Sequence, residues 1–380
     1  MGQLARASLA PAQYGRPRLT KLQLLLSCHS QIMLINLGFS LLGLVLTTMI
    51  CESFARKKYF KFRVEAAVPG KLKTRLSALP YSEVDYNKQF KTAFPSQKQR
   101  VARFSKKASN SNSLINYCDG LRRTSFVPLN KKIDSRIYLF GGSTIDCQEV
   151  PDDYTIASRL QAKINDSGLQ ETYEVINCGV IGATLAANLI HFRELPKSKS
   201  DICIFYFGVN ETNFQNENIY TSRFLIFSFI DFNRLYRFAT VLNFVILKSL
   251  INKFRTFDKN NNYFREKQDQ VDQIFSEINS ICIENSVTLL TILQPFLHTR
   301  SPVSQFDKGN LRYHKGPAFD ASKYLYEQFV KKFDNRNYFI DGRSLFNNVE
   351  LDVFTDWCHC NYLGNDIIAD YFFSLVQKNT

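Results

Sequence analysis

From residue 136 onward, short apolar runs of strand length alternate with longer amphipathic stretches of helix length. The predicted strands cover residues 136–140, 174–178, 202–207, 287–293 and 338–340. The predicted helices cover residues 154–164, 184–195, 268–283, 321–333 and 364–376. Strands separated by helices are joined by crossovers, which give a parallel sheet covered by helices. The alternation therefore predicts one α/β domain.

The composition limits the class of protein. A chain of 380 residues that is 45% hydrophobic and 22% charged is long enough for one large α/β domain with appended segments. The net charge of +14 suits nucleic acid, anionic lipid or an acidic polymer. The basic residues crowd into 56–63 and 88–107, after a hydrophobic segment, which favours a membrane surface. A solvated basic linker explains the charges equally well. No nucleic-acid-binding motif is present, so we expect no nucleic acid partner.

The hydrophobic segment Ile32–Cys51 contains no charged residue. Its length of roughly 20 residues matches a helix that crosses a bilayer. A cleaved signal peptide would have a shorter apolar region and a small-residue cleavage site. We therefore predict an N-terminal tail at 1–31, a single transmembrane helix at 32–51, a basic linker with edge structure at 52–130, and a catalytic domain at 131–380.

The side of the membrane on which the domain lies stays open. Basic residues flank the predicted anchor on both sides and are denser after it. The positive-inside bias then favours a cytoplasmic domain, although large domains are translocated regardless of flanking charge. We lean toward an extracytoplasmic domain, and the oligomeric state is open too.

The cysteines predict neither a disulfide framework nor a metal site. Nine cysteines are an odd number, and Cys178 and Cys203 lie within strand-like runs where a buried free thiol is common. Cys358 and Cys360 flank His359, but a second Cys or His pair at metal spacing is absent. We expect no metal and no cofactor.

Polar and glycine residues follow the predicted strands, where the chemistry of a parallel sheet collects. Ser143 follows the first strand, Gly182 the second and Asn210 the third, while Asp356 and His359 share one loop before the last helix. A serine hydroxyl is a poor nucleophile unless an imidazole takes its proton, and the imidazole needs an acidic partner that fixes its tautomer. All three residue types are present at this edge.

Four motifs in this order carry a resemblance to a known family. They are Gly-Gly-Ser-Thr at 141–144, Asn-Cys-Gly-Val-Ile-Gly-Ala-Thr at 177–184, Phe-Gly-Val-Asn-Glu at 207–211 and Asp-Trp-Cys-His at 356–359. Together they resemble the SGNH hydrolase superfamily, the GDSL-type esterases and lipases, from about residue 136 to the C-terminus. The resemblance implies a flavodoxin-like three-layer α/β/α domain with a parallel sheet.

The resemblance also implies roles for individual residues. Ser143 would be the nucleophile, His359 its base and Asp356 the partner of that base. The backbone of Ser143, with Gly182 and Asn210, would form the oxyanion hole.

Two glycines support these motifs. Gly142 stands where the commonest form of the first motif has aspartate, a change shared by many members, and Gly208 allows the turn that aims the asparagine. No Gly-x-Ser-x-Gly elbow surrounds the serine, which argues against the ordinary α/β-hydrolase fold.

Each residue also has a purely structural interpretation. Ser143 could cap the helix that follows it. Asn210 and the glycines could only form tight turns, and His359 could be a structural histidine. Glu211 suits a surface or substrate-contacting position. The other histidines lack a neighbouring acid and are expected to be structural or exposed: His29, His191, His298 and His314.

A stretch at about 216–256 is inserted after the third motif. Its central part, residues 219–254, is rich in Phe, Leu and Ile but is broken by charged residues, so it does not fit a second membrane span. We predict one or two amphipathic helices here, acting either as a further core layer or as a lid or membrane-facing wall near the site.

These features predict a membrane-anchored serine esterase that forms an acyl-enzyme, with an O-acylated surface glycan as the favoured substrate. A lipid esterase or lysophospholipase, or an O-acyltransferase, would use the same residues. The alternative from another class is an inactive SGNH-like domain that binds glycan or scaffolds a membrane complex.

Overall fold

The structure is a computed structural model, and it describes residues 114–118, 120–212, 220–222, 255–304, 307–308, 311 and 316–380. The predicted tail, the anchor Ile32–Cys51 and most of the basic linker lie outside these residues. Within the described part of the chain, no helix is both long and apolar enough to cross a membrane.

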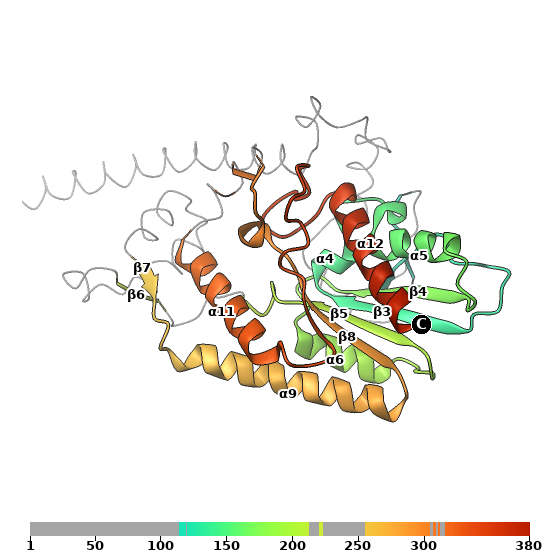
Figure 1. The fold of residues 1–380 in the computed structure, drawn as a ribbon, viewed down its shortest axis with the longest axis horizontal. Helices are drawn as coiled ribbons and strands as arrows, with labels where there is room; N and C mark the ends of the chain where they lie inside the picture. The colour runs from blue at the N-terminus through green and yellow to red at the C-terminus, as the bar shows by residue number, and fades with distance from the viewer. Residues whose placement is uncertain are drawn as a thin grey trace, which may run out of the picture. The chain divides into compact units, whose positions relative to one another are not determined.

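A seven-stranded, mostly parallel sheet forms the centre of the described fold (Figure 1). Its order is β1-β2-β4-β3-β5-β8-β9. The five parallel strands are β3 (Ser135–Gly141), β4 (Tyr173–Gly179), β5 (Ile202–Phe207), β8 (Thr288–Leu293) and β9 (Phe339–Asp341). Numbered by sequence, their order is 2-1-3-4-5, as in doubly wound sheets of the flavodoxin type. Such sheets bind ligands at the point where the strand order reverses, here between β3 and β5.

Helices cover both faces of the sheet, so the described fold has three layers. On one face lie α5 (Ile156–Asp166) and α12 (Tyr362–Asn379), which share a core with Ile137 and Leu139 of β3. On the other face lie α6 (Leu185–Glu194), α9 (Asn262–Glu284) and α11 (Pro317–Phe333). These three pack against Tyr138 and Phe140. The alternation of β3 side chains between the two cores follows from the two-residue period of a strand.

The strands and helices predicted within 136–207 and 268–376 are confirmed. The largest differences are at two helix starts: α9 begins at Asn262 rather than Gln268, and α11 at Pro317 rather than Ala321. The side chain of Asn261 accepts a hydrogen bond from the backbone of Tyr263, and this cap starts α9 upstream of its apolar periodicity. Pro317 occupies the first turn of α11, where its missing N–H costs nothing.

The described ends of the predicted helical insertion are strands. β6 (Tyr220–Ser222) pairs antiparallel with β7 (Arg255–Phe257) in a separate two-stranded sheet. The prediction of helix was therefore wrong for residues 220–222, because their pairing partner lies more than thirty residues away and local periodicity cannot reveal it. Residues 223–254 lie outside the described part.

Two short strands precede the predicted start of the catalytic domain at residue 131. β1 (Tyr117–Cys118) pairs with β2 (Leu121–Arg122), which pairs antiparallel with β4 at the sheet edge. Arg122 is buried there, and its Nε donates to Asp152 Oδ1 at 2.6 Å. The guanidinium also donates to the carbonyl oxygens of Cys147 and Val150. The segment that follows Ser143 is thus held by a residue from the predicted linker.

Candidate active site

Ser143 lies at the carboxyl end of β3, as the first residue of the short helix α4 (Ser143–Asp146). Gly142 is the N-cap residue of this helix, and its cap has no side-chain hydrogen bond. The Ser143 hydroxyl is therefore not used as a helix cap. As the first helical residue, Ser143 also has a backbone N–H without an acceptor inside the helix.

The loop before α12 is closed by its own hydrogen bonds. The N–H of Thr355 donates to the His359 carbonyl at 2.8 Å, and Phe354 forms an isolated antiparallel bridge with Cys360. Asn361 then caps α12 by accepting hydrogen bonds from two backbone N–H groups at its start. This closure fixes the loop that carries Asp356 and His359.

Within that loop, Asp356 is oriented by the backbone. Its Oδ1 accepts hydrogen bonds from the N–H groups of Cys358 and His359, at 2.8 and 2.9 Å. Its Oδ2 is left for the imidazole and lies 2.8 Å from His359 Nδ1. The short spacing between the two residues allows one turn to supply both contacts.

The other side of the imidazole faces the serine. His359 Nε2 lies 2.7 Å from Ser143 Oγ, across 216 residues of sequence. A carboxylate on Nδ1 selects the tautomer with hydrogen on Nδ1, so Nε2 is free to accept the hydroxyl hydrogen of Ser143. The structure thus brings Ser143, His359 and Asp356 into one continuous hydrogen-bonded chain.

Burial and charge shift the pKa values of Asp356 and His359 in opposite directions. Burial opposes ionisation of Asp356, but the facing imidazole and the hydrogen bonds that the carboxylate accepts outweigh it and hold the pKa of Asp356 well below its usual range. Burial likewise opposes the protonated form of His359, yet attraction to Asp356 raises the pKa of His359 well above its usual value. Asp356 therefore stabilises the positive charge that would form on His359 when Nε2 accepts a proton.

A second carboxylate, which the sequence analysis missed, faces the same imidazole. Glu149 Oε1 lies 3.9 Å from His359 Nδ1, and its side chain is 23% exposed. Burial raises the pKa of Glu149, and attraction to His359 limits the rise. Glu149 adds to the negative potential that raises the pKa of His359. In the sequence, Glu149 is marked only by its position six residues after Ser143. This spacing does not show that its side chain points toward His359.

The predicted oxyanion residues come from the two neighbouring strand ends. Gly182 lies exposed in the turn between β4 and α6. Asn210 follows β5, and its Nδ2 donates to the Ala183 carbonyl at 2.8 Å. A primary amide has two N–H groups, so one remains beyond the bond to Ala183.

Asn210 also lies directly against the turn that carries Ser143. A Cβ placed on Gly142 would come within 2.2 Å of Asn210 Nδ2. A side chain at residue 142 would therefore displace the amide of Asn210 from its observed position.

Gly208 and Glu211 shape the turn that carries Asn210. Gly208 has φ +125°, which favours glycine, and its N–H donates to Glu211 Oε2 at 2.7 Å. Glu211 Oε1 accepts from the backbone N–H of Leu185, at the start of α6. Glu211 is buried, so it does not take the surface position, one of the two that the sequence suggested. It instead ties the β5 turn to the positive end of a neighbouring helix.

The same loop offers the one group of possible metal ligands found among the described residues. Atoms of Asp356, Cys358 and His359 lie within 4.8 Å of one another. However, both imidazole nitrogens already face hydrogen-bond partners, Asp356 on Nδ1 and Ser143 on Nε2. The imidazole therefore suits the hydrogen-bonded arrangement better than a metal ion.

Comparison with known proteins gives structural neighbours only. No known protein family matches the sequence, and no curated protein is similar to it. Similar solved structures include the acetyl xylan esterase AlAXEase (13% identity, 63% of this chain and 99% of that chain, TM-score 0.38). Others are the acetylxylan esterase Axe2 of Geobacillus stearothermophilus (13%, 64% and 94%, 0.36) and a putative acylhydrolase of Bacteroides fragilis (12%, 67% and 92%, 0.35). These values are too low to identify a family or a substrate for this chain.

Proposed function

We propose that this chain is a serine esterase that works through an acyl-enzyme. The observation that carries the proposal is the hydrogen-bonded chain from Ser143 Oγ through His359 to Asp356, with distances of 2.7 and 2.8 Å. This is the arrangement that a serine hydroxyl needs in order to attack a carbonyl carbon at neutral pH.

In the proposed reaction, Ser143 Oγ attacks the ester carbonyl while His359 Nε2 takes the hydroxyl proton. The carbonyl oxygen becomes an oxyanion, which the N–H groups of Ser143 and Gly182 and the amide of Asn210 stabilise. Each such donor lowers the barrier by about 3 kcal/mol. The imidazolium returns its proton to the leaving alcohol, and a water activated by His359 then releases the acid.

Membership of the SGNH superfamily and attachment to a membrane belong to this proposal. The first is supported by the four motifs and by a strand order in which three of them follow the neighbouring strands β4, β3 and β5. The second is supported by the uncharged segment Ile32–Cys51. We propose an O-acylated surface glycan as the substrate. A panel of ester substrates would also detect the two alternatives, which are hydrolysis of lipid esters and transfer of the acyl group to an acceptor hydroxyl.

An active-site-directed fluorophosphonate tests the proposal on the full-length chain. We expect the wild type to be labelled on serine and Ser143→Ala to be unlabelled. Ser167→Ala, which changes a serine after α5 on the helical layer, is the matched control and should label normally. Folded wild-type protein that takes no label, or labelling that persists in Ser143→Ala, would show that the domain is not a serine hydrolase of this design.

A further inference from the structure

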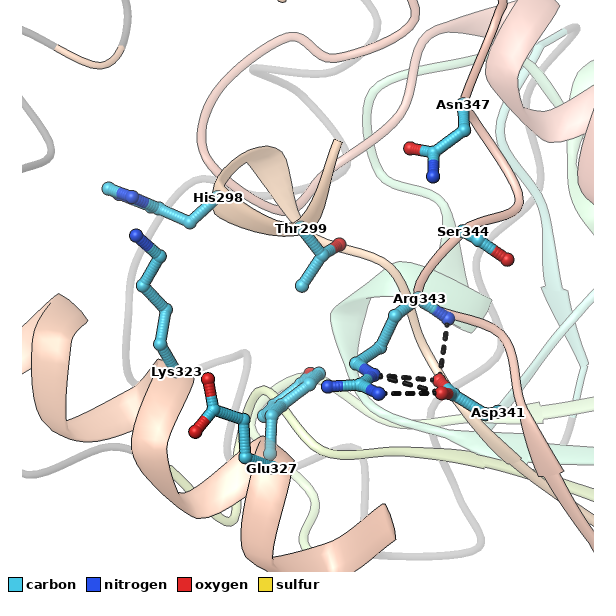
Figure 2. A pocket seen from close by; sticks show the side chains of 9 residues that line it. His298, Thr299, Lys323, Glu327, Asp341, Arg343, Ser344 and Asn347 are labelled. Carbon is cyan, nitrogen blue, oxygen red and sulfur yellow. Dashed lines mark hydrogen bonds and ion pairs between the residues drawn. The ribbon is translucent and has the colours of Figure 1, made fainter. Parts of the chain in front are cut away.

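A cavity of about 290 Å³ lies beyond the carboxyl ends of β8 and β9 (Figure 2). No triad residue lines it. Its lining comes from the turn after β8, from α11, and from the end of β9 and the segment that follows it: His298, Thr299, Lys323, Tyr326, Glu327, Asp341, Arg343, Ser344 and Asn347. This volume is at the lower end of small-molecule sites and suits one ring rather than a long chain.

The orientation of the Arg343 side chain in this cavity is fixed by an ion pair. Its Nε and Nη2 each donate to the Asp341 carboxylate at 2.8 Å, so the planar guanidinium is fixed in a bidentate pair. Among the residues that the structure describes, Nη1 has no hydrogen-bond partner. Figure 2 shows the guanidinium of Arg343 joined to Asp341 on one side of the cavity. The pair thus presents a fixed donor beside fixed acceptors.

The charges of the lining cancel. Lys323 and Arg343 are positive, while Glu327 and Asp341 are negative. An anionic ligand would meet both carboxylates, and a cation would meet both basic groups. A neutral ligand that both donates and accepts hydrogen bonds matches the lining better. Hydroxyl groups on a sugar ring have this property.

The cavity is joined to the catalytic loop by aromatic contacts. His298 stacks on Phe319 with ring centroids 4.9 Å apart, and Phe319 meets Trp357 edge-on at 5.4 Å. The carbonyl of Trp357, two residues before His359, accepts a hydrogen bond from Leu297 N at 2.8 Å.

Tyr326 forms the wall on the other side. Besides lining the cavity, its hydroxyl lies against Gly208, where a Cβ would approach to 2.4 Å. The cavity therefore borders both the base loop and the turn that carries Asn210.

We propose that this cavity is a saccharide subsite, which binds one neutral sugar ring of a substrate whose ester lies at Ser143. The inference rests on the proposed esterase function and names the substrate class: a neutral glycan ester. Arg343, oriented by Asp341, is the specificity-determining residue, because it contacts the sugar and not the reacting carbonyl.

The test compares two acetyl esters on the full-length chain: 4-nitrophenyl acetate, which has no sugar, and O-acetylated methyl cellobioside. We expect Arg343→Met to lower kcat/KM for the cellobioside ester about 10- to 100-fold, mainly through KM, since a charged hydrogen bond is lost. Hydrolysis of 4-nitrophenyl acetate should change less than twofold. Ser344→Trp, which narrows the cavity from an exposed position, should have the same selective effect without removing a buried group.

Arg336→Met is the matched control. Arg336 also pairs with an aspartate, Asp272, and its side chain is exposed to a similar extent (30% against 28% for Arg343). Unlike Arg343, it lies before the amino end of β9. It should leave both esters unaffected. Equal losses on both esters, or no loss with either cavity variant, would overturn the subsite while leaving the esterase proposal intact.

If the wild type hydrolyses neither ester, the proposed function fails, and the cavity is then tested by binding alone. Saturation-transfer NMR of Ser143→Ala protein with methyl cellobioside should give a signal that Arg343→Met removes. Absence of the signal, or a signal that the substitution does not change, would overturn the subsite as well.

Discussion

His359 Nε2 lies 2.7 Å from Ser143 Oγ, although the two residues are separated by 216 positions in the chain. The first stands in a loop closed by its own backbone, and the second begins a helix at the end of β3. The sheet fixes the distance between the loop and the helix, so the contact between His359 and Ser143 depends on the whole domain. The contribution of each residue can be tested by substitution.

Replacing Asp356 with asparagine should lower kcat by about 10⁴-fold with little change in KM. An amide N–H pointing at Nδ1 favours the tautomer with hydrogen on Nε2, which cannot accept the serine proton. Steady-state kinetics on 4-nitrophenyl acetate measures the change. Asp366→Asn, which alters a surface ion pair with Arg159, is the control. Full activity in Asp356→Asn would remove Asp356 from the triad.

Glu149→Gln should move the acid limb of the kcat/KM profile to lower pH. Burial lowers the pKa of His359, but negative charges that include those of Asp356 and Glu149 raise it by more, and the proposed base works only when it is deprotonated. Removing one negative charge destabilises the imidazolium and lowers the pKa of His359. Activity below neutral pH should therefore rise relative to the plateau.

The exposed Glu284, at the end of α9, supplies the matched control for this profile. Glu284→Gln should leave the limb in place. A limb that stays fixed, or moves to higher pH, in Glu149→Gln would exclude an electrostatic role for Glu149 at the base.

Gly142→Ala should slow catalysis by about 10²-fold while the protein stays folded. The backbone at residue 142 has φ −87°, which alanine adopts without strain, but the new methyl would come within 2.2 Å of Asn210 Nδ2. The amide must then move away from the proposed oxyanion position.

A double-mutant cycle separates this effect from a general disturbance. If the methyl acts by displacing Asn210, the variant Gly142→Ala/Asn210→Ala should be no slower than Asn210→Ala alone. Losses that multiply would mean that Gly142 acts independently of the asparagine.

Arg122→Met should lower the free energy of unfolding by about 3–5 kcal/mol, because it leaves the buried Asp152 carboxylate without its ion-pair partner. The paired side chains are 0% and 5% exposed. Arg136→Met breaks a pair with Glu174 whose side chains are 36% and 31% exposed, and it should cost about 1 kcal/mol or less. Urea denaturation followed by the fluorescence of Trp357, the only tryptophan, compares the two. Equal losses would contradict the structural role of Arg122.

The prediction of the fold succeeded where the signal was local. β5 was predicted with the bounds that the structure has, Ile202–Phe207, because an unbroken apolar run between polar turns can only be buried on both faces. The strand β6 was missed because its register with β7 depends on a segment far along the chain.

The sequence by itself determined the alternation of strands and helices. It placed Ser143, Gly182 and Asn210 at strand ends and the Asp356–His359 loop before the last helix, because hydrophobic periodicity and turn chemistry are properties of neighbouring residues. Only the tertiary structure decided which polar side chains face one another. It turned Glu149 toward His359, and it buried Glu211 beneath the Asn210 turn. The physical reason is that burial and charge pairing arise between segments distant in sequence, where the free energy of a carboxylate is set by partners that no local pattern contains.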